Sequence, residues 1–252
     1  MPRANRYILP GYVYHLTHRC HNRSFLLRFA IDRNAYLLRL RKSAREYQIS
    51  ILNYSLTCNH THMLAITHRI NSISRLMQKL EGQFAVHYNL RKDRSGAFWG
   101  ERFHCTMVES GEHLWNCMKY IDLNMVRAGV VGHPVDWRWC GYHELVGRRR
   151  RYRLLDLRRV VELFAQAEQA SFAQTYEAAI AQAIAERRLN REPIWTQSIA
   201  VGSKSFVRGI AHVTKKRRRL EMEENVDGVW YLREAEVTYG INRLQRVRIH
   251  AR

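Results

Sequence analysis

The sequence lacks most of the features that mark secreted, thiolate-metal or membrane proteins. Its five cysteines are an odd number, and no two of them stand in a C-x-x-C spacing, which argues against a disulfide framework and a thiolate zinc site. No apolar run is long enough to span a bilayer, and the N-terminus has no signal-peptide segment. These absences predict a protein of the reducing cytoplasm that has no membrane partner.

Acidic residues are scarce as well. The chain of 252 residues has 22 Asp and Glu against 42 Lys and Arg, which gives a formal net charge of +20, and its first 31 residues include no acid. Such a field favours a polyanion, which could be DNA, RNA or an anionic membrane surface. Because the basic residues are spread through folded-looking segments rather than along one amphipathic helix, nucleic acid is the expected partner.

The apolar pattern predicts an α+β fold. Runs of aromatic and β-branched residues predict strands at residues 12–17, 49–56, 60–67 and 103–108. Helical spacing predicts one helix that Asp32 would cap, a second over residues 72–90 and a third from about Glu112. The resulting β-α-β-β-α-β order is that of a ferredoxin-like antiparallel sheet, followed here by one additional helix.

The composition changes near residue 147. Residues 148–151 and 215–219 are basic runs, and an alanine-rich stretch of helical character covers residues 154–188. We therefore expect residues 1–146 to form one domain and residues 147–252 to form a basic, mainly helical accessory region.

Two residue pairs suggest chemistry. His60 and His62 are two apart in a predicted strand, so both imidazoles emerge on one face and could share a metal ion. Tyr120 and Asn124 are four apart in the third helix, so a phenol and an amide would project from one helix face. The alternatives are two polar residues at a hairpin exit, a buried tyrosine with a hydrated hydroxyl, and an asparagine near the helix end.

Together these motifs resemble a known family. Asn59-His60-Thr61-His62-Met63-Leu64 resembles the histidine-hydrophobic-histidine (HUH) motif of HUH nucleases. The ten residues from Tyr120 to Gly129 resemble the tyrosine helix of REP-associated tyrosine transposases, which are single-tyrosine HUH transposases. Supporting matches, spread over residues 1 to about 146, are Pro2-Arg3, residues 9–15, residues 98–103 and residues 137–142. The sequence departs from the family at Thr61, usually aliphatic, and at Met125, usually proline.

The resemblance implies a metal-dependent endonuclease and strand transferase that acts on single-stranded or hairpin DNA of repetitive palindromic elements. It implies that His60, His62 and Asn124 hold Mg²⁺ or Mn²⁺ and that Tyr120 attacks the scissile phosphate. The products would be a 5′-phosphotyrosine and a free 3′-hydroxyl. Such an enzyme would work in the cytoplasm on nucleoid DNA, as a monomer or a homodimer.

Other residues could contact the DNA. Basic side chains near the first strand and in the glycine-flanked aromatic loop could bind phosphates, and they are Arg3, Arg6, Arg19, Arg23 and Arg102. Phe98 and Trp99 in the same loop could stack on unpaired bases, although filling the core is an equally good explanation.

Two other functions account for part of the sequence. A non-catalytic nucleic-acid-binding module would explain the charge and the fold but would leave the histidine pair and Tyr120 as coincidences. A zinc hydrolase would use His60 and His62 with His104 as its third ligand. A nuclease of the HUH type could also serve its host on dispersed repeats rather than move its own gene.

Overall fold

The computed structural model of the protein describes residues 8–165, 168–214 and 220–235. Its first half contains the predicted β-α-β-β-α-β order, with every predicted strand within two residues of its place. The elements are β1 (Val13–Arg19), α1 (Ala30–Glu46), β2 (Ser50–Leu56), β3 (His60–Ile66), α2 (Ser72–Arg91) and β4 (His104–Val108). These four strands are antiparallel in the order β2-β3-β1-β4, which confirms the ferredoxin-like sheet within an α+β fold.

Different helices pack on the two faces of the sheet. On one face lie α1 and α2, joined by the hydrogen bond that Tyr36 Oη donates to Glu81 at 2.9 Å. On the other face lies α3 (Glu112–Asp122), whose Met118 carbonyl accepts from Asn53 Nδ2 of β2. Because side chains alternate along a strand, odd-numbered residues of β1 and even-numbered residues of β3 share the α3 face. His15, His60 and His62 are therefore brought to one side of the sheet.

The start of α1 differs from the prediction. The helix begins at Ala30 with Phe29 as its N-cap, so Asp32 is not the cap but lies in the first turn. Its side chain is buried and forms an ion pair with Arg91 at the end of α2. A carboxylate in the first turn still complements the helix dipole, and this one also ties the two helices together.

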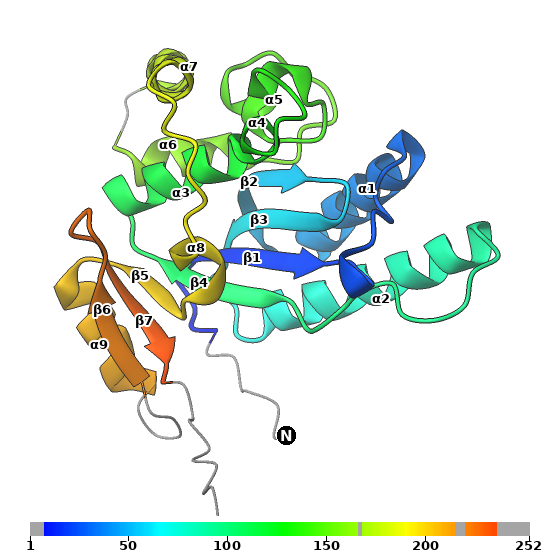
Figure 1. Ribbon diagram of the computed structural model, residues 1–252, viewed down its shortest axis with the longest axis horizontal. Helices are drawn as coiled ribbons and strands as arrows, with labels where there is room; N and C mark the ends of the chain where they lie inside the picture. Colours follow the sequence, from blue (N-terminus) through cyan, green and yellow to red (C-terminus); the bar gives the residue numbers. More distant parts are fainter. Residues whose placement is uncertain (1–7, 166–167, 215–219, 236–252) are drawn as a thin grey trace, which may run out of the picture.

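The second half is mainly helical, as predicted, but it also adds strands to the sheet. After α3 come η2 (Pro134–Asp136) and the helices α4 (Asn124–Arg127), α5 (Tyr142–Leu145), α6 (Leu157–Leu163), α7 (Gln169–Ala185), α8 (Ile194–Gln197) and α9 (Lys204–Thr214). Three strands accompany them, β5 (Ala200–Gly202), β6 (Leu220–Glu224) and β7 (Trp230–Glu234). β5 adds to β4 in parallel, and the sheet continues as β2-β3-β1-β4-β5-β7-β6 (Figure 1).

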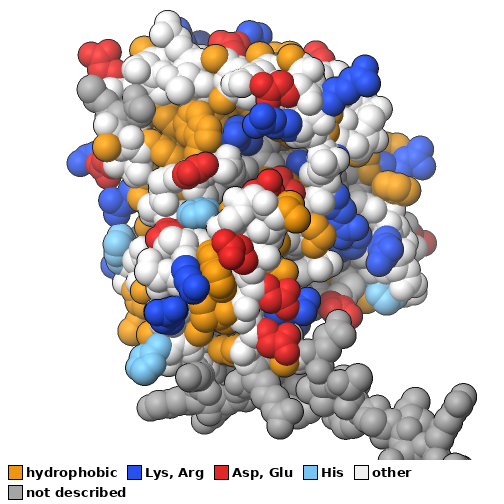
Figure 2. Space-filling view, turned by 60° about the vertical axis from the view of Figure 1, so that its left-hand side comes forward, with side chains coloured by type: hydrophobic (Ala, Val, Ile, Leu, Met, Phe, Trp, Pro, Cys, Tyr) orange, Lys and Arg blue, Asp and Glu red, His pale blue; other side chains and the backbone are white. Residues whose placement is uncertain are grey.

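The sequence pattern missed these strands because β5 is only three residues long and β6 carries three glutamates. On this side of the molecule acidic, basic and apolar side chains are interspersed, so positive charge is not concentrated there (Figure 2). The basic run of residues 215–219 lies outside the described residues. Among the helices that the structure describes, none is long and apolar enough to cross a membrane.

A buried carboxyl ties the second half to the sheet. Asp122, at the end of α3, accepts hydrogen bonds from Asn53 Nδ2 at 3.0 Å and from Tyr176 Oη of α7 at 2.6 Å. Asp122 is 2% exposed. Burial raises its pKa to about 7, although both hydrogen bonds act in the opposite direction.

This raised pKa predicts that the protein loses stability as the pH rises from about 4 to about 7. In that window the folded state retains a proton that the unfolded state has released, so raising the pH favours unfolding. The change would be on the order of a few kcal/mol. The variant Asp122→Asn, which is isosteric with the protonated carboxyl, should flatten this part of a plot of Tm against pH. An unchanged slope in the variant would contradict the assignment.

Candidate functional site

Four predicted site residues converge on the α3 face of the sheet. The ring centroids of His60 and His62 are 4.8 Å apart, and the ring of Tyr120 lies 6.1 Å from that of His62. Asn124 Nδ2 lies 3.0 Å from His62 Nε2. The helix axis breaks at Leu123, between α3 and α4, yet Tyr120 and Asn124 both face the histidines.

His62 is oriented by a chain of hydrogen bonds that begins at the backbone. His15 Nδ1 lies 2.8 Å from the carbonyl oxygen of Trp195, an acceptor, so His15 carries its proton on Nδ1. Its Nε2 must then accept from His62 Nδ1, 2.9 Å away. This leaves the lone pair of His62 Nε2 directed at Asn124, where a metal ion could share it.

His60 is fixed in the same tautomer by local contacts. Its Nδ1 lies 2.7 Å from Asn59 Oδ1, which can only accept, and 2.8 Å from Thr57 Oγ1. The proton therefore sits on Nδ1 and the lone pair on Nε2. The three-residue turn between β2 and β3 thus supplies the partners that orient the first histidine of the motif.

Burial keeps these imidazoles neutral. It lowers the pKa of His15 and that of His60 to about 3, and the charges of Arg19 and Arg191 add to the effect on His60. The pKa of His62 also lies well below its ordinary value, through burial and then through His60 and His15. At neutral pH both histidines of the motif are therefore uncharged, the form that binds metals.

The donor set fits Mg²⁺ or Mn²⁺. Within the described residues, no group of three His, Cys, Asp or Glu side chains is placed to hold a metal ion. The predicted third ligand, Asn124, is an amide next to His62, and turning that amide would direct Oδ1 to the place that Nδ2 occupies. Two imidazoles and an amide oxygen suit manganese and tolerate magnesium.

The zinc alternative loses its third ligand. His104 Nε2 lies 2.9 Å from the carbonyl oxygen of Ser198 and is engaged there. His104 also belongs to no group of three metal-binding side chains among the residues that the structure describes. A zinc hydrolase built on His60, His62 and His104 is therefore not supported.

Tyr120 is buried against cations. The residue is 5% exposed, and the guanidinium of Arg127 lies 4.2 Å from the centre of its ring. Burial raises the pKa of Tyr120, while the charges of Arg127 and Arg191 lower it. The cations that act on this phenol are therefore the two arginines.

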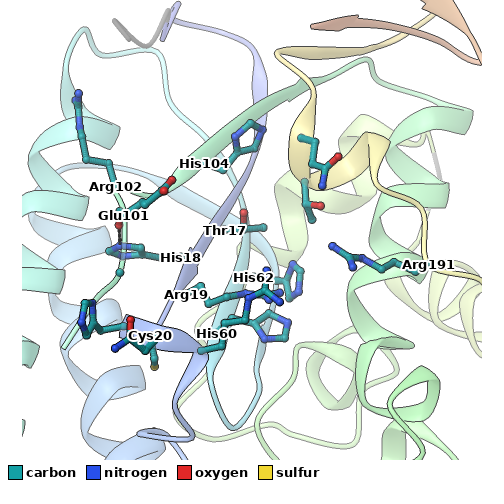
Figure 3. A pocket seen from close by; sticks show the side chains of 16 residues that line it. Thr17, His18, Arg19, Cys20, His60, His62, Glu101, Arg102, His104 and Arg191 are labelled. Atoms are coloured by element: carbon teal, nitrogen blue, oxygen red, sulfur yellow. Dashed lines mark hydrogen bonds between the residues drawn. The ribbon is translucent and has the colours of Figure 1, made fainter. Parts of the chain in front are cut away.

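A cleft of about 620 Å³ opens beside the histidines. Three predicted DNA-binding arginines line it, namely Arg19, Arg23 and Arg102. From the opposite side Arg191 points toward Arg19 and His62 (Figure 3). This concentration of positive charge beside the candidate nucleophile suits a phosphodiester backbone. Arg3 and Arg6, the other two predicted arginines, lie outside the described residues.

The aromatic loop is part of the core rather than a free surface. Phe98 is 2% exposed and packs edge-on against Phe84 and Tyr88, so the core-filling explanation holds for it. Trp99 stacks on His18 with ring centroids 4.3 Å apart and donates its indole N–H to the Glu81 carbonyl. Trp99 is partly exposed, but one face of its indole is already covered.

Sequence reasoning missed four residues of this site. The sequence contains a local signal for His15 and Arg127. His15 alternates onto the same face of the sheet as His60 and His62, and Arg127 follows Tyr120 by two helical turns. Arg191 and Trp195 left no such signal, since they lie in the segment between α7 and β5, which includes the short helix α8 and reaches the site only through the fold. That segment also contributes the Leu189 carbonyl, which accepts from Arg127 Nε at 3.1 Å.

We expect His15→Phe to weaken Mn²⁺ binding by about 10- to 100-fold, because His62 loses the acceptor that fixes its tautomer. His15→Gln should retain part of the affinity, since its amide oxygen can accept the same proton. Isothermal titration with Mn²⁺ measures the effect, with His212→Ala, an exposed histidine of α9, as the control. Equal affinities in wild type and His15→Phe would contradict the role of His15.

Residues 9–124 match the family model described as "Transposase IS200 like". A solved structure described as a REP-associated tyrosine transposase bound to a REP hairpin is 21% identical, with a TM-score of 0.51 over 59% of this chain and 87% of that one. At this identity the likeness shows a shared fold. A candidate transposase from Deinococcus radiodurans is 15% identical over 52% of this chain and 98% of that one, with a TM-score of 0.35. No curated protein matches the chain.

Proposed function

The chain belongs, through residues 9–124, to the IS200-like transposase family, and on this premise we propose that it is a metal-dependent single-stranded DNA endonuclease and strand transferase with Tyr120 as its nucleophile. The matched family is consistent with the resemblance that the two sequence motifs predicted. The observation that carries the proposed chemistry is the convergence of Tyr120, Asn124 and the histidine pair beside a cleft lined by arginines.

Mg²⁺ or Mn²⁺, held by His60, His62 and Asn124, would polarise the scissile phosphate and stabilise the leaving 3′-oxygen. The bonds that form and break involve the chain's own tyrosine. The phenolate oxygen of Tyr120 attacks the phosphorus, the bond to the 3′-oxygen breaks, and the DNA on the 3′ side of the break remains joined to the tyrosine through its 5′-phosphate. A 3′-hydroxyl from another strand end can attack this 5′-phosphotyrosine, which releases the phenolate and completes strand transfer without ATP.

Arg127 and Arg191 assist the nucleophile. Both cations lower the pKa of a phenol whose pKa burial raises, so they favour the phenolate. Arg127 is held in place by hydrogen bonds to the carbonyls of Leu189 and Tyr120. Arg19, Arg23 and Arg102 would bind the phosphates that flank the scissile one.

The substrate that best fits is unpaired DNA next to a hairpin. A tyrosine that is 5% exposed reaches a phosphate more readily in a flexible single strand than in a rigid duplex. The structure of similar fold is described as bound to a REP hairpin, and we extend that substrate class, repetitive palindromic DNA, to this chain. All four site residues come from one chain, which is compatible with either a monomer or a homodimer. The enzyme would act on nucleoid DNA in the cytoplasm.

The rival explanation, a binding module without catalysis, predicts affinity for DNA but no covalent adduct. Incubation with end-labelled hairpin DNA and Mn²⁺ or Mg²⁺ should give a wild-type adduct that survives denaturing electrophoresis. Tyr120→Phe should lose it by at least about a thousandfold, since a ring without an oxygen cannot form the ester. His62→Ala should lose most of it. Tyr47→Phe serves as the matched control, and an adduct with Tyr120→Phe would refute the assignment.

The pH profile of adduct formation tests the electrostatic role of Arg127. Because the pKa of Tyr120 is raised, the phenolate is the minor form near neutral pH, and the rate should climb by up to about tenfold per pH unit. Arg127→Gln removes a charge that lowers this pKa, so the profile should move to higher pH and the rate near neutrality should fall. A profile that only scales down, without moving, would contradict this role.

A further inference from the structure

A second basic hollow lies at the β2 edge of the sheet, apart from the cleft beside His60. It has a volume of about 380 Å³ and is formed by α1, β2 and two loops that follow α4. Its lining includes four arginines and no acidic residue, and the side chains that matter here are Arg41, Arg138, Arg149, Arg151, Trp139 and Tyr152. The proposed reaction gives none of these six residues a role.

The arginines differ in how far they are already engaged. Arg149 is committed to the protein, since it donates to Tyr54 Oη at 2.7 Å and to the Arg138 carbonyl at 2.6 Å. Arg138 and Arg151 are exposed at the rim. The Nε of Arg41 is buried without a hydrogen-bond partner among the described residues. The hollow thus holds guanidinium groups whose N–H donors are not all engaged in hydrogen bonds within the described residues.

Two aromatic rings accompany these cations. Tyr152 is 81% exposed, an uncommon position for a large ring, and the guanidinium of Arg41 lies 5.7 Å from its centre. Trp139 is held rigidly, because Arg33 covers it at 4.2 Å and its indole N–H donates to Asn34 Oδ1 at 3.0 Å. Aromatic faces beside guanidinium groups are the pattern of single-stranded nucleic-acid sites.

The hollow is close to the cleft along the sheet. Residues 139–141 run along the outer edge of β2, where Leu56 N donates to the Trp139 carbonyl at 2.9 Å and Ser55 pairs with Cys140. Since β2 pairs with β3, Trp139 lies two strand spacings, or about 10 Å, from the backbone of β3. The turn of residues 57–59 connects β2, whose Tyr54 lines the hollow, to His60 at the start of β3.

We propose that this hollow binds the single-stranded DNA that continues beyond the cleft, with Arg41, Arg138 and Arg151 on its phosphates and a base stacked on Tyr152. The identity of the ligand rests on the proposed function. The basic character continues past the hollow, where Arg45 and Arg153 line an adjoining depression. Its one acid, Asp156, is occupied by the Ser50 hydroxyl and the backbone N–H of Arg159.

The test compares a short unpaired strand of about 8 nucleotides, which fills the cleft alone, with one of about 30. Arg138→Ala/Arg151→Ala should weaken binding of the long strand and reduce the slope of log affinity against log salt by about 1.4, or about 0.7 for each lost phosphate contact. Tyr152→Ala should weaken long-strand binding at least about fivefold, and Tyr152→Phe should not. The short strand should bind all variants as it binds wild type.

Arg75→Ala/Arg208→Ala is the matched control, because both residues are exposed and lie outside the cleft and the hollow. The proposal is overturned if the two double variants bind the long strand alike, if short and long strands lose affinity equally, or if only duplex binding falls. Adduct formation on the short strand is scored separately. Wild type that forms no adduct, with long-strand affinity still lost in the variants, would refute the proposed chemistry and leave the hollow assigned.

Discussion

The hydrogen-bond chain from the Trp195 carbonyl through His15 to His62 is the constraint on which the candidate site depends. A backbone carbonyl can only accept a hydrogen bond, so the nitrogen that carries the proton is fixed in both His15 and His62. The lone pair of His62 Nε2 is consequently fixed in direction before any ligand arrives. A site whose geometry is set in advance spends less binding energy on ordering its own groups.

The same series of hydrogen bonds brings residues beyond 147 into the candidate site. The Trp195 carbonyl, the Leu189 carbonyl and the side chain of Arg191 all come from the segment between α7 and β5, which includes the short helix α8. The segment is anchored on both sides, by the Asp122–Tyr176 hydrogen bond and by the pairing of β5 with β4. Hydrogen bonds thus cross the boundary that the sequence predicts near residue 147.

Much of this arrangement could be predicted from the sequence, and the reasons for the rest are physical. Strand parity placed His60 and His62 on one face, and helical spacing placed Tyr120 with Asn124, because both rules act within a few residues. Arg191 and Trp195 reach the site through tertiary packing alone, which no local pattern encodes. Phe98 shows the opposite limit, because the sequence pattern of an aromatic residue in a loop is the same whether its ring stacks on a base or fills the core. The sequence allowed Asp32 to be the cap of α1, but it lies in the first turn, where it pairs with Arg91 of the distant helix α2.

The seven-stranded sheet also has two outer edges, and each is closed differently. Residues 139–141 cover the backbone of β2. At the other end of the described strands, β6 carries three glutamates in five residues, and two of them form ion pairs with Arg233 of β7. Charged side chains along an edge strand oppose the addition of another copy's strand. The segment that covers β2 and the charged residues of β6 therefore both disfavour edge-to-edge pairing of two copies of this long sheet.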